Sequence, residues 1–209
     1  MNNRKIGKLI LALAGIILVG TGVSFNAAAS LGNDPVGIVY DGIRNAAHLS
    51  AQQLGMASNL VNVALVCVIF FLGRRYVNIG TFIYILPYGT VVDFGGRLYH
   101  KLPFGQSLTG RVMGASIGCL LLYIGVAMFI TADIGLDPFT GLVMVIRDRV
   151  GREYRIVKIC FDVGCIVAGT LLGGKLGVIT VLTALTAGPV IQLFAEKMQK
   201  AAAGRQHRT

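Results

Sequence analysis

Few side chains in this sequence can do chemistry, and the most conspicuous are aspartates that interrupt apolar segments. Asp34 and Asp137 each precede a proline, and the surrounding segments read LGNDP at 31–35 and IGLDP at 134–138. In both, a glycine can end one helix, the aspartate can cap the next, and the proline suits its first turn. The sequence therefore predicts two long helices that each break and restart at once as a short helix.

Two functions fit the paired breaks. If the N-termini of the short helices meet, their free N–H groups and positive dipole ends can bind an anionic or polar solute. In the simpler interpretation, Asp34 and Asp137 only cap short interfacial helices and their carboxylates are satisfied by the adjacent backbone. The two interpretations are compatible.

Asp162 and Asn62 form a second polar pair, because both lie inside apolar runs. A charged group at the centre of a spanning helix costs roughly 3 kcal/mol and should face the interior of a helix bundle. Asn62 needs a hydrogen-bond partner there for the same reason. The pair can line a pathway in which Asp162 takes up a proton. It can equally hold neighbouring helices together by hydrogen bonds, with Lys158 as the i,i+4 partner of Asp162.

Asp93 and Gln192 form a third pair, near helix ends, where either a pathway or the membrane interface would suit them. The residues that we predict to line a pathway or substrate site are Asp34, Pro35, Asp137, Pro138, Asn62, Asp162, Asp93 and Gln192.

Enzyme signatures are missing from the sequence. It has no paired histidines, HExxH, GxSxG or P-loop motif. The four cysteines lie in apolar runs and the three histidines are isolated, so neither set has the spacing of a metal site. We expect no catalytic residues, no cofactor and no metal.

Composition places the chain in a membrane. Of its 209 residues 55% are hydrophobic and 13% charged, and the mean hydropathy is +0.72. An ordinary soluble domain carries about 25% charged residues, and a disordered chain is poor in apolar ones. The net charge of +10 then points to cationic loops on the cytoplasmic face rather than to nucleic acid.

Apolar runs long enough to cross a bilayer lie at about 8–29, 56–73, 78–95, 108–131, 156–173 and 176–195. Shorter segments lie between them at about 35–47 and 138–148. We therefore predict an all-α polytopic membrane helix bundle with about six long transmembrane helices. The two short segments are predicted to be broken or re-entrant helices.

The two halves of the sequence resemble each other. Residues 7–43 align with residues 110–146 without a gap, so that Gly15 meets Gly118 and Gly22 meets Gly125. Further along, Asn62 aligns with Asp162. Aligned glycine, aspartate and proline residues indicate an internal duplication. The predicted organisation is a first membrane repeat at 1–103, a second repeat at 104–198 and a basic cytoplasmic tail at 199–209.

Loop charges predict that both chain termini lie in the cytoplasm. If six helices cross, about 14 Lys and Arg residues lie inside and about 5 outside; if the short helices also cross, the split is about 16 to 3. Three crossings in each repeat make the halves inverted, whereas four make them parallel. A 12-residue helix rises about 18 Å, too little for a core of about 30 Å. Length therefore favours six crossings.

The sequence resembles the YczE/YyaS/YitT group of small bacterial membrane proteins over nearly its whole length. The resemblance rests on GNDP at 32–35, DG at 41–42, Asn62, NIGT at 78–81, YGTVVDF at 88–94, RIVK at 155–158, Asp162, GGKLG at 173–177 and AGP at 187–189. It departs at Ile179, where the group's pattern expects glycine, and at Phe139-Thr140, where it expects an aspartate-containing turn. The resemblance implies a multi-pass protein of the bacterial inner membrane.

These features favour a small-solute transporter or permease-like protein, with proton coupling through Asp162. The alternative is a non-transporting accessory or regulatory protein that scaffolds a partner through the basic segment 147–158. The expected partners are the lipid bilayer and a small solute, with no nucleic acid. Glycines spaced four apart, at 114 and 118 and at 169 and 173, could serve internal packing or a homodimer.

Overall fold

The computed structural model describes residues 3–104 and 107–206 of the chain. Every regular element in these residues is helical. The α-helices are α1 (Asn3–Ala29), α2 (Pro35–Ala46), α3 (Leu54–Gly73), α4 (Ile79–Lys101), α5 (Leu108–Ala132), α6 (Pro138–Val150), α7 (Tyr154–Leu171) and α8 (Val178–Gln206). Two short 3-10 helices, η1 (Ala51–Gln53) and η2 (Arg74–Tyr76), flank α3. The predicted tail at 199–209 continues α8, and residues 207–209 lie outside the described residues.

The all-α prediction is confirmed, and α2 and α6 are the short helices, with 12 and 13 residues. Four helical segments are both long and apolar enough to cross a membrane, and these are Lys5–Ala29, Ala51–Tyr76, Leu108–Ala132 and Val178–Lys200. The helices α4 and α7 are 23 and 18 residues long but carry more polar side chains. Of the six predicted spans, four therefore have both the length and the apolar composition.

Each of the two predicted breaks has the same backbone form. The residue directly after α1, Ser30, has φ +55°, and its counterpart after α5, Asp133, has φ +49°. Two residues further on, Gly32 and Gly135 also have positive φ values, of +102° and +153°. A left-handed residue ends a helix sharply, and glycine adopts positive φ without steric cost. The chain therefore turns out of the long helix within a few residues and starts the short one.

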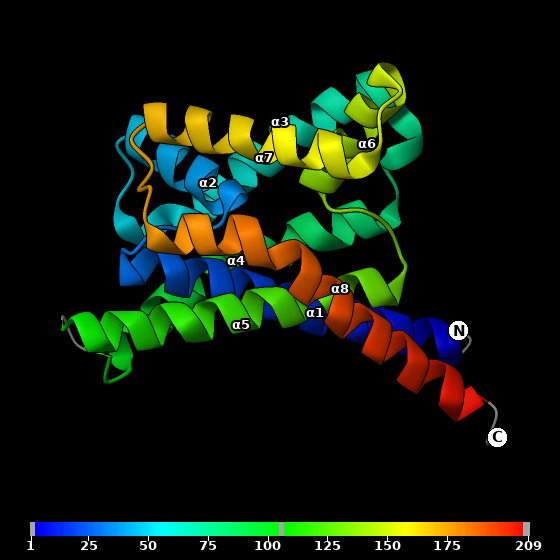
Figure 1. The fold of residues 1–209 in the computed structure, drawn as a ribbon, viewed down its shortest axis with the longest axis horizontal. Coiled ribbons are helices and arrows are strands. Elements are labelled where there is room, and N and C mark those ends of the chain that lie inside the picture. Colours follow the sequence, from blue (N-terminus) through cyan, green and yellow to red (C-terminus); the bar gives the residue numbers. More distant parts are fainter. Residues whose placement is uncertain (1–2, 105–106, 207–209) are drawn as a thin grey trace.

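The helices α1 and α5 pack closely and run antiparallel along the lower side of the molecule in Figure 1. Their contact is made by glycines. A Cβ on Gly15 would lie 2.7 Å from the carbonyl oxygen of Gly125, and one on Gly22 would lie 2.6 Å from that of Gly118. Because the lower-numbered glycine of one helix meets the higher-numbered glycine of the other, the two helices point in opposite directions.

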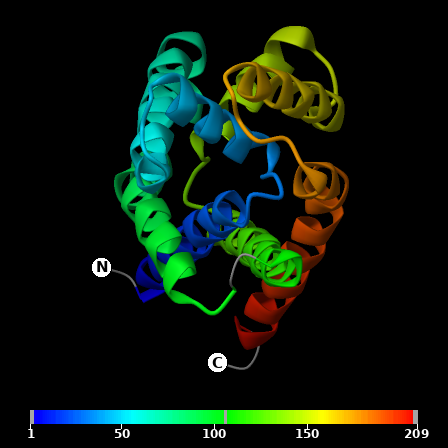
Figure 2. The same cartoon turned by 90° about the vertical axis from the view of Figure 1, so that its left-hand side faces the viewer.

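Two of the remaining helices flank this pair, and the others pack mainly on one another. The helix α4 packs on α1, and α8 packs on α5. The short helix α2 packs mainly on α7, while α6 packs on α3 (Figure 2). Each short helix therefore lies against a helix from the other half of the sequence.

Large apolar side chains point outward from this bundle. The most exposed include Phe71 at 84%, Leu171 at 82% and Leu86 at 77%. So large an apolar surface is unfavourable in water and suits the acyl chains of a bilayer. The glycines at 114, 118 and 169 face Tyr99, Asn26 and Ile38, so they serve packing within the chain.

The successive long helices alternate in direction, which gathers the connections at two ends of the molecule (Figure 1). The first residues of α1, η2, the turn between α6 and α7, and the last residues of α8 lie at one end, which we call the basic end. The turn between α2 and α3, the last residues of α4, the first residues of α5 and the turn between α7 and α8 lie at the opposite end.

Gly22→Ala should destabilise the bundle, because its Cβ would meet backbone atoms of α5 that cannot move independently. Overpacking of this kind costs about 1–3 kcal/mol, and the melting temperature in detergent should fall accordingly. The matched control is Gly164→Ala in α7, where a Cβ meets nothing within 4 Å. An equal melting temperature for the two variants would contradict the glycine contact.

Candidate polar site between the broken helices

The two aspartates at the breaks cap the short helices, as predicted. Asp34 accepts a hydrogen bond from the amide of Val36 through Oδ2 at 3.2 Å. Asp137 accepts one from the amide of Thr140 through Oδ1 at 3.0 Å. The second oxygen of Asp34, Oδ1, is buried without a hydrogen-bond partner. Capping by the Val36 amide therefore uses one Asp34 oxygen, and the other lies buried beside the amide of Gly37.

Asn33 fixes the break that precedes α2. Its Nδ2 donates to the carbonyl oxygen of Val23 at 3.1 Å, which satisfies a backbone acceptor of α1. Its Oδ1 accepts from the amide of Asp34 at 3.0 Å. Because one buried side chain holds both sides of the break, the position of Asp34 is set by hydrogen bonds rather than by loop packing.

The side chain of Asn62 forms a hydrogen bond, as we expected for a polar residue inside an apolar helix. The hydroxyl of Tyr40, in α2, donates to Asn62 Oδ1, in α3, at 3.0 Å. Both residues are fully enclosed, with relative exposures of 1% and 0%. The Nδ2 of Asn62 is buried and has no partner in the structure. This pair links α2 to α3 and leaves one strong donor unused.

A cluster of aromatic rings surrounds Tyr40. Tyr84 and Tyr88, one turn apart on α4, stack with their ring centroids 4.9 Å apart. Tyr88 lies 5.9 Å from Tyr40, which in turn meets Phe139 of α6 edge-on at 5.6 Å. We call Tyr40, Tyr84 and Tyr88 the tyrosine cluster. It joins both short helices to α4.

An ion pair from α7 completes the site. Lys158 and Asp162 bond directly, and their side chains are 34% and 21% exposed. Both charges lie within electrostatic range of Asp34, and Lys158 also lies within range of Asp137. The carboxylates of Asp34 and Asp137 both act on Tyr40. We call the residues Asp34, Tyr40, Asn62, Asp137, Lys158 and Asp162 the central polar group.

The eight residues predicted to line a pathway have different positions. Six belong to or adjoin the central polar group, and these are Asp34, Pro35, Asn62, Asp137, Pro138 and Asp162. Asp93 instead accepts from the amide of Gly55 at 2.6 Å and so ties α4 to the start of α3. Gln192 is exposed on α8 and bonds to Glu196 at 2.9 Å. The structure does not bring these last two residues to the central polar group.

The tyrosines are the site residues that the sequence analysis missed. Tyr84 and Tyr88 are four residues apart, so they share one face of their helix, and this spacing was a usable signal. The contact of Tyr40 with Asn62 joins residues 22 positions apart and had no such signal. Across the described part of the chain, no group of three or more His, Cys, Asp or Glu side chains is arranged to hold a metal ion.

Comparisons with known proteins place the sequence in a family. The model of a family of unknown function, DUF6198, matches residues 6–196. The chain belongs to the DUF6198 family. Its long apolar helices and its similarity to a protein described as a membrane protein identify the chain as a membrane protein.

Three similar proteins support this assignment. An uncharacterized protein of Haemophilus influenzae is 28% identical over 191 residues, which cover 91% of this chain and 83% of that protein. The uncharacterized membrane protein YczE of Bacillus subtilis is 26% identical over 86% of this chain and 81% of its own length. YyaS of the same organism is 21% identical over 86% of this chain and 88% of its own. The predicted YczE/YyaS-like relationship is thus confirmed, and no solved structure matches the chain.

Tyr40→Phe should destabilise the protein, because it removes the one hydrogen bond that Asn62 makes in a fully buried position. Such bonds contribute about 1 kcal/mol in membranes, and a buried amide left unpaired costs about 1–3 kcal/mol. A double-mutant cycle with Asn62→Leu, read from melting temperatures in detergent, isolates the pair. If Tyr40→Phe costs as much beside Leu as beside Asn62, the bond is not the cause.

Proposed function

We propose that this DUF6198 protein carries a small solute across the bacterial inner membrane, through a pathway lined by the central polar group. The observation that carries the proposal is a set of ionisable side chains held between two broken helices, within reach of a buried carboxylate oxygen that lacks a partner. Buried charges are costly in a bilayer and are retained mainly where they serve transport of ions or solutes. Broken helices that meet at such a site are typical of secondary transporters.

The contact between α1 and α5 supports an arrangement of two inverted repeats. In the sequence alignment Gly15 corresponds to Gly118, and Gly22 corresponds to Gly125. In space Gly15 meets Gly125, and Gly22 meets Gly118. Such reciprocal contacts are what a two-fold relation between equivalent helices produces. Together with the antiparallel direction, they favour three crossings in each half, and hence six in all.

The charges at the two ends of the molecule support an orientation in which both chain termini lie in the cytoplasm. The basic end contains the first and last turns of the chain. It also contains the arginines of η2 and the arginines between the end of α6 and the start of α7. The opposite end carries few, and these are Arg44, Arg97, Lys101, Arg111 and Lys175. We therefore place the basic end and both termini in the cytoplasm, following the positive-inside rule.

The central polar group indicates the class of solute. It contains three carboxyl groups and one ammonium group, and both aspartates at the breaks already occupy the helix N-termini that would otherwise attract an anion. The electron-rich rings of the tyrosine cluster, which lie beside these carboxyl groups, favour a cation over an anion. We therefore propose a small solute that carries a cationic nitrogen. Protonation of Asp162 would weaken its pairing with Lys158 and couple the movement of the solute to that of protons.

Asp162→Asn and Asp137→Asn should each abolish most of the flux, because each removes a charge from the proposed pathway. Currents carried by methylammonium and choline can be measured with proteoliposomes on a solid-supported membrane. Uptake of acetate and of glycerol by the same proteoliposomes provides the comparison. Glu153→Gln, at an exposed position before α7, removes the same charge elsewhere and should leave flux unchanged.

Three outcomes discriminate between the hypotheses. Flux of acetate or glycerol but of neither cation would contradict the solute class. Wild-type flux in both aspartate variants would contradict the pathway. If no solute moves, yet substitutions of the arginines at 147–155 impair a partner in cells, the accessory role is the better function.

Cysteines introduced at Ala47 and Arg152 should label from opposite sides of the membrane, because the two positions lie at opposite ends of the molecule. In a variant without native cysteines, a membrane-impermeant maleimide added to intact cells should modify Ala47→Cys and reach Arg152→Cys only after lysis. Labelling of both from the outside would overturn the proposed orientation and the count of six crossings.

A further inference from the structure

A cavity of about 320 Å³ lies at the basic end, and none of the residues that line it belongs to the central polar group. It is bounded on one side by the end of α3 with η2, and on the other by the last turns of α6. The residues that line it are Leu72, Gly73, Arg74, Arg75, Tyr76, Val145, Asp148 and Arg149.

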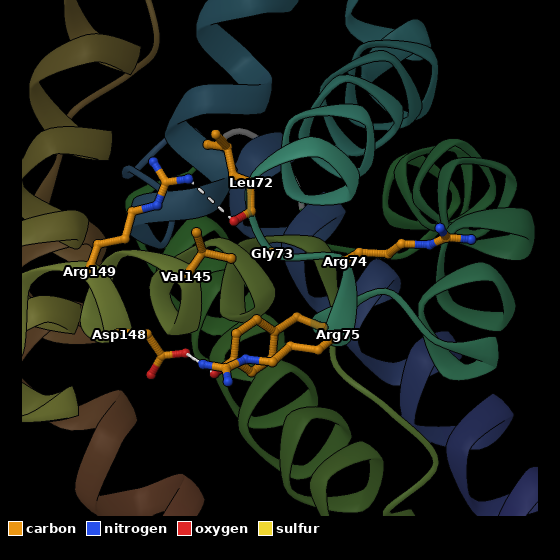
Figure 3. A pocket seen from close by; sticks show the side chains of 8 residues that line it. Leu72, Gly73, Arg74, Arg75, Val145, Asp148 and Arg149 are labelled. Atoms are coloured by element: carbon orange, nitrogen blue, oxygen red, sulfur yellow. Dashed lines mark hydrogen bonds and ion pairs between the residues drawn. The ribbon is translucent and has the colours of Figure 1, made fainter.

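Asp148 is the one carboxylate among the described residues that line this cavity, and both of its oxygens already have bonding partners. Asp148 pairs with Arg75 and with Arg147, the latter at 2.6 Å, and it also accepts from the hydroxyl of Tyr76. Hydrogen bonds from Tyr76 and Arg147 keep the pKa of Asp148 below its ordinary value, so it stays ionised. Its charge holds Arg75 in place at the cavity wall (Figure 3).

The arginines around the cavity carry more charge than Asp148 can neutralise. Arg149 donates to the backbone oxygen of Leu72 at 3.3 Å, and Arg74 lies 4.9 Å above the ring of Phe70, pointing away from Asp148 (Figure 3). In the described structure neither forms an ion pair with a carboxylate. Together with Arg75 and Arg147 they set four guanidinium groups against one carboxylate, which is an environment for an anion.

The cavity also adjoins the lipid-facing surface. Phe70, Phe71 and Leu72, which directly precede the arginines, are 44%, 84% and 43% exposed. Val150 on the other wall's helix is 60% exposed. Apolar side chains that give way to arginines within one or two residues mark the level of the lipid head groups.

We propose that this cavity binds the phosphodiester of an anionic phospholipid of the inner leaflet. Arg75 and Arg149, on opposite walls, are the phosphate ligands, and Arg74 lies at the rim. The acyl chains follow the exposed surface of Phe71 and Leu72. A basic pocket at the cytoplasmic face, beside apolar helix surface, has the chemistry that anionic head groups require. The bound lipid joins α3 to α6 and thereby stabilises the contact between them.

The test uses the purified full-length protein in detergent, titrated with phosphatidylglycerol, phosphatidylcholine or inorganic phosphate and followed by native mass spectrometry and melting temperature. Phosphatidylglycerol should bind and raise the melting temperature, whereas phosphatidylcholine should bind at least about tenfold more weakly. The double variant Arg75→Gln/Arg149→Gln should lose at least about tenfold in affinity for phosphatidylglycerol. Arg152→Gln, a basic residue of the next turn that does not line the cavity, should change it less than about twofold.

Each other result overturns the proposal. Equal losses in Arg152→Gln and in the double variant would mean that surface charge alone attracts the lipid. Equal binding of phosphatidylcholine would exclude an anion site. Displacement of phosphatidylglycerol by inorganic phosphate at equal concentration would identify a free-phosphate site instead. The double variant keeps the pairing of Asp148 with Arg147 and Tyr76, and an unchanged size-exclusion profile would show that it folds.

Discussion

Buried backbone carbonyl and amide groups need hydrogen-bond partners, and the packing around the two helix breaks of this protein follows from that requirement. Each break exposes carbonyl and amide groups that other segments must satisfy. Arg111 of α5 donates to the carbonyl oxygens of Ala29 and Ser30 at 2.7 and 2.6 Å. The start of α8 and the start of α4 contribute in the same way, through Ile179 N to Leu31 O and Thr81 Oγ1 to Leu136 O. A break is stable only when the other half of the chain is packed against it.

The distribution of polarity among the helices follows from the same requirement. The helices α4 and α7, which are the long helices that lack the apolar composition of a simple span, are those that carry Tyr84, Tyr88, Lys158 and Asp162. Polar side chains are tolerated there because the short helices α2 and α6 bring partners to the same depth. These two helices are therefore less apolar than ordinary membrane spans because they supply polar side chains to the centre of the molecule.

Sequence reasoning worked where the signal was local. Asp34 and Asp137, each followed by proline, predicted both breaks, and the i,i+4 spacing of Lys158 and Asp162 predicted their pairing. It failed where contacts join distant segments. Nothing in periodicity indicates that Tyr40 bonds to Asn62, or that the turn after α3 meets the end of α6. The alignment of the halves also paired Asp93 with Gln192, although one bonds to a backbone amide and the other is exposed. Side chains that the alignment of the halves pairs can therefore have different roles.

The unpartnered oxygen of Asp34 and the unpartnered amide nitrogen of Asn62 have a consequence for selectivity. Both atoms are buried, and one is an acceptor while the other is a donor. A visiting molecule that offers both a donor and an acceptor relieves two penalties at once, whereas a hydrocarbon of the same size relieves neither. If a solute passes through this centre, as we propose, discrimination there depends on the number of hydrogen bonds that the solute completes, and much less on its shape.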